Sequence, residues 1–179
     1  MTHYQQLFDI AADNYGIVTS SQAKREGISD KEMSAIASRG RIRRLRRGVY
    51  KIVDYIPVEN DPYAEAVALV GTDAYLYGES VLAMLRLAPT NPMRIIVATP
   101  KRVRKRLPKH IRVEPAPPGV VPTEYDGIPS EPVADAIRSC RSRLMPVRLE
   151  DAAREAHHQG YVTAEEEKAL LALIESEVG

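Results

Sequence analysis

The chain has 179 residues, of which 44% are hydrophobic and 27% are charged, a composition typical of a globular protein with one large domain or two small ones. The single cysteine, Cys140, excludes an intramolecular disulfide and a zinc site built on paired cysteines, so we expect a protein of the reducing cytoplasm. The net charge of +1 conceals an asymmetry: residues 1–56 carry 10 Lys and Arg against 6 Asp and Glu, residues 57–112 carry 9 against 5, and residues 113–179 carry 6 against 13. A basic front of this kind favours a polyanionic partner.

The sequence predicts neither secretion nor membrane insertion. Residues 1–14 mix polar side chains through their apolar positions and lack the positively charged lead and apolar core of a signal peptide. The longest apolar stretches, near residues 64–70 and 94–98, fall far short of the roughly 20 residues that a membrane-spanning helix needs. We therefore expect no membrane partner.

Three short helices are predicted at the start of the chain. Apolar residues recur at helical spacing from Tyr4 to Ala11, and Gly16 is a plausible helix end. A second helix is expected over about 21–25, after a hydroxyl cap, and a third over about 29–38, ended by Arg39-Gly40. Two short helices joined by a tight turn and preceded by a packing helix are the layout of a helix-turn-helix.

A β-hairpin is predicted directly after these helices, at Arg41 to Ile52. Ile42 and Leu45 precede Arg46-Arg47-Gly48, and Val49, Tyr50 and Ile52 follow it. A two-stranded ribbon at this place makes a helix-turn-helix winged. Residues 54–62 contain two prolines and read as a linker, so the first domain is expected to span residues 1–56.

The remaining residues, 57–179, predict a C-terminal mixed α/β domain that ends in helices. Helical patterns cover residues 63–70, 78–87, 133–144, 149–159 and 163–178, and Thr163 with Glu166 fits a capping box. Strand patterns cover residues 93–98, 111–113 and 120–121. The predicted fold class is α+β, with a winged helix-turn-helix domain followed by this second domain.

The basic stretch from Arg39 to Lys51 is the strongest candidate for a functional surface. It holds 7 Lys and Arg in 13 residues and no acid. Because side chains alternate along a strand, Ile42 and Leu45 can anchor the hairpin while the arginines project toward phosphate oxygens. The alternative is a solvated hairpin on an unrelated domain. The candidate DNA contacts of the wing are Arg39, Arg41, Arg43, Arg44, Arg46, Arg47 and Lys51.

The second and third helices supply further candidates. Gln22, Lys24 and Arg25 are expected to contact phosphates. The third helix would be the recognition helix, and its outward polar residues are Ser29, Asp30, Lys31, Ser34 and Ser38. None of these forms the bidentate Arg–guanine or Asn–adenine pair that reads sequence strongly, and the alternative is that they are merely the exposed face.

A second basic cluster follows the predicted strand at 93–98. Residues 101–112 contain seven positive side chains. Three interpretations compete: a further nucleic-acid contact, a docking surface for an acidic partner, and a solvated loop. The candidate DNA contacts of this cluster are Lys101, Arg102, Arg104, Lys105 and Arg106.

No catalytic, cofactor or metal site is predicted. A nuclease of the restriction type would carry acids on adjacent strands to hold magnesium, and residues 93–98 contain none. His157 and His158 are adjacent on a helix, where side chains point about 100° apart and do not easily share an ion. The sequence shows neither a glycine-rich phosphate loop nor a Gly-x-Ser-x-Gly motif, so we expect a protein that is not an enzyme.

The order of three motifs resembles the AbiEi-type antitoxins, the transcriptional regulators of type IV toxin-antitoxin pairs. The motifs are Gly16-Ile17-Val18-Thr19, Gly40-Arg41-Ile42-Arg43-Arg44-Leu45 and Arg47-Gly48-Val49-Tyr50. The layout of residues 94–98 and 128–140 is also similar to the C-terminal half of that family.

The resemblance implies a function as well as a fold. It implies an autorepressor that binds inverted repeats in its own promoter, with Arg43, Arg44, Arg46 and Arg47 as DNA contacts, and that counteracts a nucleotidyltransferase toxin. It leaves open whether the toxin is touched directly and whether the protein dimerises on DNA. The competing hypothesis is a protein-binding module whose acidic C-terminal helices neutralise the toxin by direct complex formation.

Overall fold

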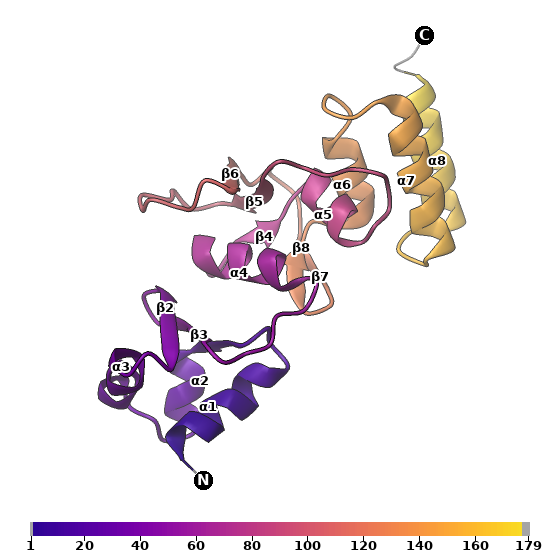
Figure 1. Cartoon of the computed structure of the whole chain (residues 1–179). Helices are drawn as coiled ribbons and strands as arrows, with labels where there is room; N and C mark the ends of the chain where they lie inside the picture. The colour runs from indigo at the N-terminus through magenta and orange to yellow at the C-terminus, as the bar shows by residue number, and fades with distance from the viewer. Residues whose placement is uncertain (1, 177–179) are drawn as a thin grey trace. The chain divides into compact units, whose positions relative to one another are not determined.

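The computed structural model describes residues 2–176, and the chain divides into two compact units, 1–72 and 73–179. Figure 1 shows the order of helices and strands along each unit. Within the described residues, no helix combines the length and the apolar character that a membrane crossing requires.

Unit 1 begins with the three predicted helices. They are α1 (His3–Ala12), α2 (Ser20–Arg25) and α3 (Asp30–Ser38). Thr19 and Ser29 cap α2 and α3, and each cap forms a reciprocal capping box with the residue three positions later. Because the two caps lie at the predicted helix starts, local sequence alone explains where α2 and α3 begin.

A three-stranded antiparallel sheet completes the helical part of unit 1. Its strands are β1 (Ile17–Thr19), β2 (Ile42–Arg46) and β3 (Val49–Ile52), in the order β1-β3-β2. Strands β2 and β3 form the predicted hairpin, with Gly48 at φ 73° in the turn and a register shift between Arg44 and Arg46. This order of helices and strands is consistent with a winged helix-turn-helix.

The core of unit 1 is formed where the helices meet one face of the sheet. Leu7, Ile28, Met33 and Ile52 are the largest side chains in it, and each is at most 1% exposed. Burying side chains of this size contributes about 1.5–3 kcal/mol each. The core therefore fixes the helices against the hairpin and determines which hairpin side chains stay outside.

A fourth helix, α4 (Asp61–Val70), also belongs to unit 1. We expected a domain boundary after Ile56, whereas the compact unit continues to Thr72. The reason is that α4 packs on β2 and is tied to hairpin side chains at both of its ends. The predicted linker is reduced to the residues between β3 and α4.

Unit 2 contains a five-stranded mixed sheet with the order β6-β5-β4-β8-β7. The strands are β4 (Tyr75–Leu76), β5 (Ile95–Thr99), β6 (Ile111–Pro115), β7 (Thr123–Tyr125) and β8 (Ile128–Ser130). The helices are α5 (Glu79–Met84), α6 (Val133–Ser139), α7 (Pro146–His158) and α8 (Ala164–Glu175). The predicted α+β class, with helices at the end of the chain, is confirmed.

The structure differs from the sequence predictions in unit 2 at several places. Residues 120–121 form no strand, and the chain becomes a strand only after Pro122. The hairpin of β7 and β8 was not predicted, although Asp126-Gly127 is a strong turn signal and both residues have positive φ. Helix α6 ends at Ser139 rather than at residue 144, and the predicted helix end at residue 178 lies outside the described residues.

Candidate nucleic-acid interface

The two faces of the β2–β3 hairpin have different neighbours. Arg43 lies opposite Lys51 in the strand register, and Arg44 lies opposite Tyr50. Because neighbouring residues of a strand point to opposite faces, Arg44 shares a face with Tyr50, which packs in the core beneath the helices. Arg43 and Lys51 lie on the other face and contact α4.

Lys51 is a core residue of unit 1. Its side chain is 9% exposed, its ammonium group contacts the Asp61 carboxylate, and it lies 2.9 Å from Oε2 of Glu65. Arg43 binds the other oxygen of Glu65 at 2.7 Å. Burial opposes ionisation of Glu65, but the hydrogen bonds from Arg43 and Lys51 outweigh it and hold the pKa of Glu65 below its ordinary value.

The contacts of Lys51 correct its predicted role. We expected Lys51 to contact DNA, but a buried ammonium group between two carboxylates is not available to a phosphate. Arg43 is half of an ion pair although its side chain is 55% exposed. The roles of Asp61 and Glu65 were not predicted, because the predicted linker included Asp61 and the predicted helix began only at residue 63. In the structure both acids lie on α4, and their spacing of four residues places them on one helix face.

Arg46 is also engaged with α4. Its Nε donates a hydrogen bond to the carbonyl of Ala68 at 2.7 Å, and its Nη2 lies 3.4 Å from the hydroxyl of Thr72. The last carbonyls of a helix have no partner within the helix and carry partial negative charge, so a cation stabilises them. Burial of the guanidinium lowers the pKa of Arg46. Arg46 therefore holds the C-terminal end of α4.

Four more candidates have structural partners. Arg41 lies over the ring of Tyr4, 4.1 Å from its centroid, and 3.5 Å from Oδ2 of Asp54. Lys24 pairs with Asp30 at 2.7 Å. The Gln22 side chain forms part of the capping box of α2, and the Ser29 side chain forms part of the capping box of α3.

The remaining cations of unit 1 face solvent. Arg44 donates only to the carbonyl of Arg46, at 3.4 Å, within its own turn. The other four are exposed and have no ion-pair partner within residues 2–176; they are Arg25, Lys31, Arg39 and Arg47. Arg44 and Arg47 flank the hairpin tip, which the amide of Ser20 holds at the start of α2 through a 2.9 Å bond to the carbonyl of Gly48.

The outward face of α3 is polar but carries few groups that read bases. Ser34 and Ser38 are exposed, and their hydroxyls donate to helix carbonyls at 2.8 and 2.9 Å, which leaves them as acceptors. The two acids of the first turn are engaged, Asp30 with Lys24 and Glu32 with His3 at 2.9 Å. The Lys24 ammonium reduces the repulsion that the Asp30 carboxylate would exert on a phosphate backbone.

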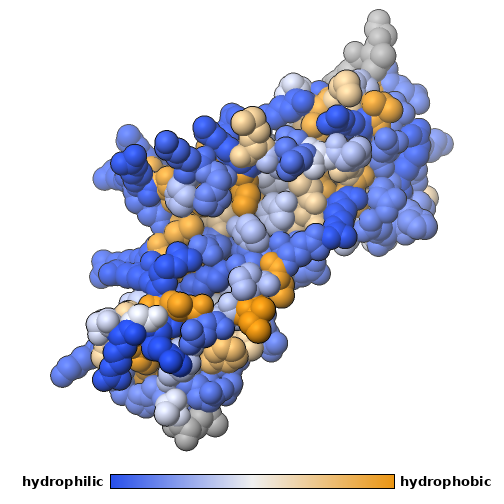
Figure 2. Space-filling model, viewed as in Figure 1, coloured by the Kyte–Doolittle hydropathy of each residue, from blue (hydrophilic) through white to orange (hydrophobic). Residues whose placement is uncertain are grey.

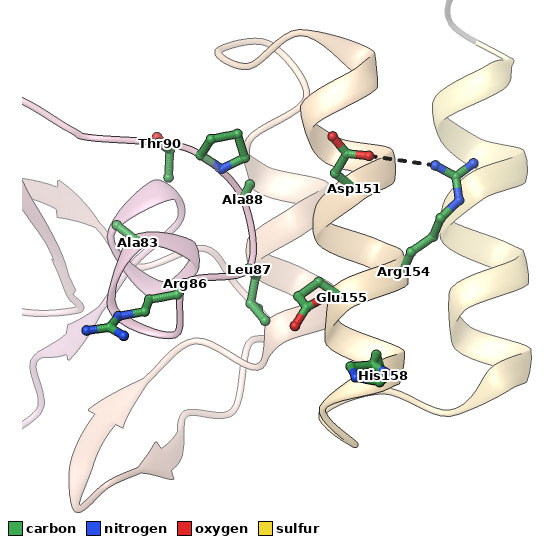
Figure 3. A pocket seen from close by; sticks show the side chains of 10 residues that line it. Ala83, Arg86, Leu87, Ala88, Thr90, Asp151, Arg154, Glu155 and His158 are labelled. Atoms are coloured by element: carbon green, nitrogen blue, oxygen red, sulfur yellow. Dashed lines mark ion pairs between the residues drawn. The ribbon is translucent and has the colours of Figure 1, made fainter.

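Unit 2 contains a pocket of about 700 Å³ between the residues that follow α5 and the side of α7 (Figure 3). Two cationic side chains, Arg86 and Arg154, and two anionic ones, Asp151 and Glu155, line it. Arg154 lies 3.9 Å from the Asp151 carboxylate. Because opposite charges balance, the pocket wall has no net charge that would select an ion. Within residues 2–176, no three His, Cys, Asp or Glu side chains gather as a metal site.

Comparison with known proteins identifies the segment that carries the hairpin. Residues 5–53 match the family described as "Transcriptional regulator, AbiEi antitoxin". We call residues 5–53 the AbiEi segment, after the family that they match. The predicted resemblance to the AbiEi antitoxins is thereby confirmed over these residues. The AbiEi segment contains α2, α3 and the complete β2–β3 hairpin.

Two further comparisons concern the whole chain. The chain is similar to the crystal structure of the RV2827C protein from Mycobacterium tuberculosis, with a TM-score of 0.44 and 17% sequence identity over 96% of this chain and 82% of that one. No curated protein matches the chain. The AbiEi segment is therefore the part of the chain for which the comparisons support a function.

Proposed function

We propose that the chain is an antitoxin and transcriptional autorepressor whose unit 1 binds inverted repeats in its own promoter. The observation that carries this proposal is the pair of exposed arginines at the hairpin tip, Arg44 and Arg47, inside the AbiEi segment. Guanidinium groups without carboxylate partners are suited to bidentate bonds with phosphate oxygens.

In the proposed complex, α3 enters the major groove and the hairpin tip contacts the adjacent backbone. Arg39 at the end of α3 and Arg25 at the end of α2 add phosphate contacts, and Lys31 lies in the first turn of α3. These contacts give affinity and position but carry no sequence information directly. Specificity then comes from Ser34 and Ser38 on α3 and from the shape of the DNA.

The antitoxin part of the proposal concerns a nucleotidyltransferase toxin, which the chain counteracts without a catalytic step, cofactor or metal of its own. Direct binding of the toxin is a second candidate, because residues 113–179 carry 6 positive and 13 negative side chains and Glu165 and Glu166 are exposed on α8. Co-purification of the full chain with the product of the neighbouring gene tests this candidate. Protection of cells without co-purification would favour regulation over direct binding.

The double variant Arg44→Ala, Arg47→Ala is expected to weaken binding to the promoter duplex by at least about 100-fold, because each lost charge-assisted hydrogen bond costs about 1.5–3 kcal/mol. Each phosphate contact contributes about −0.9 to the slope of log K against log salt, so the slope should become shallower by about 2. Fluorescence anisotropy titrations over a series of salt concentrations measure both quantities.

The matched control is Arg138→Ala, Arg154→Ala, which removes the same charge from α6 and α7, where Asp135 and Glu150 pair with these arginines. We expect the control to bind DNA like the wild type. If the hairpin variant also keeps wild-type affinity and salt slope, the hairpin tip is not a DNA contact.

A further inference from the structure

The connection between β5 and β6 in unit 2, residues 100–110, is a long loop without a helix. The two strands are parallel neighbours, so the chain must return from the end of β5 at Thr99 to the start of β6 at Ile111. Parallel strands are ordinarily joined by a crossover that contains a helix. Here residues 100–110 make the return as turns and irregular backbone, and they project from the two strands in Figure 1.

The cations of this loop differ in their partners. Lys101, next to β5, pairs with Asp73, and Arg112, on β6, pairs with Glu114 at 2.7 Å. Arg102, Arg104 and Arg106 lie between them, and all three are exposed and have no acidic partner in the part of the chain that the structure describes. Charge is therefore neutralised at the base of the loop and left uncompensated at these three arginines.

The apolar side chains of the loop are less exposed than its arginines. Val103 and Leu107 are half-buried, whereas Arg102, Arg104 and Arg106 are exposed. Three exposed guanidinium groups at alternate positions along the loop can each bind a different phosphate.

The composition of the loop favours a nucleic acid over an acidic protein. Protein interfaces are centred on buried aromatic or large apolar anchors, and residues 100–110 contain no aromatic ring other than that of His110. Figure 2 shows a mainly hydrophilic surface over the outer part of the β5–β6 loop. A row of arginines with no apolar anchor is suited to a phosphate backbone.

We propose that the β5–β6 loop is a second contact of the protein with duplex DNA, which binds the phosphate backbone through Arg102, Arg104 and Arg106 without regard to sequence. The proposal extends the DNA-binding function proposed for unit 1 and rests on it. It assigns to unit 2 a direct share in DNA affinity, separate from any contact with a toxin.

The test compares three forms of the full chain: the wild type, Arg102→Ala/Arg104→Ala/Arg106→Ala, and Arg138→Ala/Arg154→Ala/Lys168→Ala. The last removes the same charge from α6, α7 and α8. Each is titrated with a promoter duplex and with a random-sequence duplex of equal length. We expect the loop variant to bind each duplex at least about tenfold more weakly than the wild type, and the loss to be similar for the two duplexes. Its slope of log K against log salt should be shallower by about 2 to 3.

Several results would overturn this proposal. One is a loop variant that binds both duplexes like the matched control. A second is a loss confined to the promoter duplex, because a phosphate contact cannot distinguish the two. A third is unchanged DNA binding with loss of co-purification of the neighbouring gene product, which would make the loop a protein-docking surface.

The hairpin variant Arg44→Ala, Arg47→Ala, measured beside these forms, separates the two proposals. If it keeps wild-type affinity while the loop variant loses affinity, the hairpin assignment fails and the loop assignment stands. If only the hairpin variant loses affinity, the loop assignment fails. Circular dichroism of each variant excludes loss of fold as the cause, and all the substituted loop side chains are exposed.

Discussion

Replacing Lys51 with alanine is expected to lower the free energy of unfolding of unit 1 by about 3–5 kcal/mol, although the residue lies in the most basic stretch of the chain. The substitution leaves Asp61 and Glu65 without their shared ammonium group, and the Asp61 side chain is only 10% exposed. Without the Lys51 ammonium group, the buried Asp61 carboxylate keeps its desolvation penalty and loses the attraction that offset it. Urea denaturation followed by circular dichroism measures the loss, and amide hydrogen exchange of β2 and β3 assigns it to unit 1.

Lys24→Ala is the matched control, because it also removes a lysine from an ion pair. The Lys24 and Asp30 side chains are 57% and 64% exposed, so this variant should lose at most about 1 kcal/mol. The double variant Lys51→Met, Asp61→Asn should recover part of the loss, since the side chain at position 61 is then neutral and Glu65 keeps its hydrogen bond from Arg43. Equal stabilities of the Lys51 and Lys24 variants would show that Lys51 does not hold α4 in place.

The stability of unit 2 is expected to fall as the pH rises from 4.5 to about 7, because of Glu131. This carboxyl is 1% exposed, and burial raises its pKa from 4.5 to about 7 although the amide of Gly78 and the hydroxyl of Ser139 both bind it. Between these pH values the folded state holds a proton that the unfolded state has lost. Stability is therefore greatest below the unfolded pKa and declines as the pH rises through the folded pKa, by about 3 kcal/mol in total.

Glu131→Gln should abolish this part of the pH dependence, because its amide oxygen accepts the same two hydrogen bonds and does not titrate. The variant should be more stable than the wild type above pH 7. Glu124→Gln, at an exposed position of β7, is the control and should follow the wild-type curve. Thermal denaturation across the pH range checks both. A Glu131→Gln variant with an unchanged pH profile would contradict the assignment.

The local elements of unit 1 could be predicted from the sequence because local chemistry determines them. Thr19 and Ser29 start helices through capping bonds that reach only three residues ahead. Gly48 permits the turn of the hairpin, and the apolar residues on both sides of it predict the two strands. For the same reason Thr163 with Glu166 correctly located the start of α8.

Elements that depend on distant partners were not predicted. Strand β4 has only two residues, and it is a strand because it lies between β5 and β8, far away in the sequence. Helix α4 was predicted, but its place in unit 1 was not, since that place depends on pairing across the hairpin.

The basic hairpin separates what the sequence determines from what the tertiary structure determines. The sequence by itself determined that residues 41–52 form a hairpin dense in cations, because apolar residues on both sides of a glycine turn are a local property. Only the tertiary structure decided that Lys51, Arg43 and Arg46 hold α4, whereas Arg44 and Arg47 face solvent. The physical reason is that a side chain's charge is known from its type, but its partner depends on which element packs against its face of the strand.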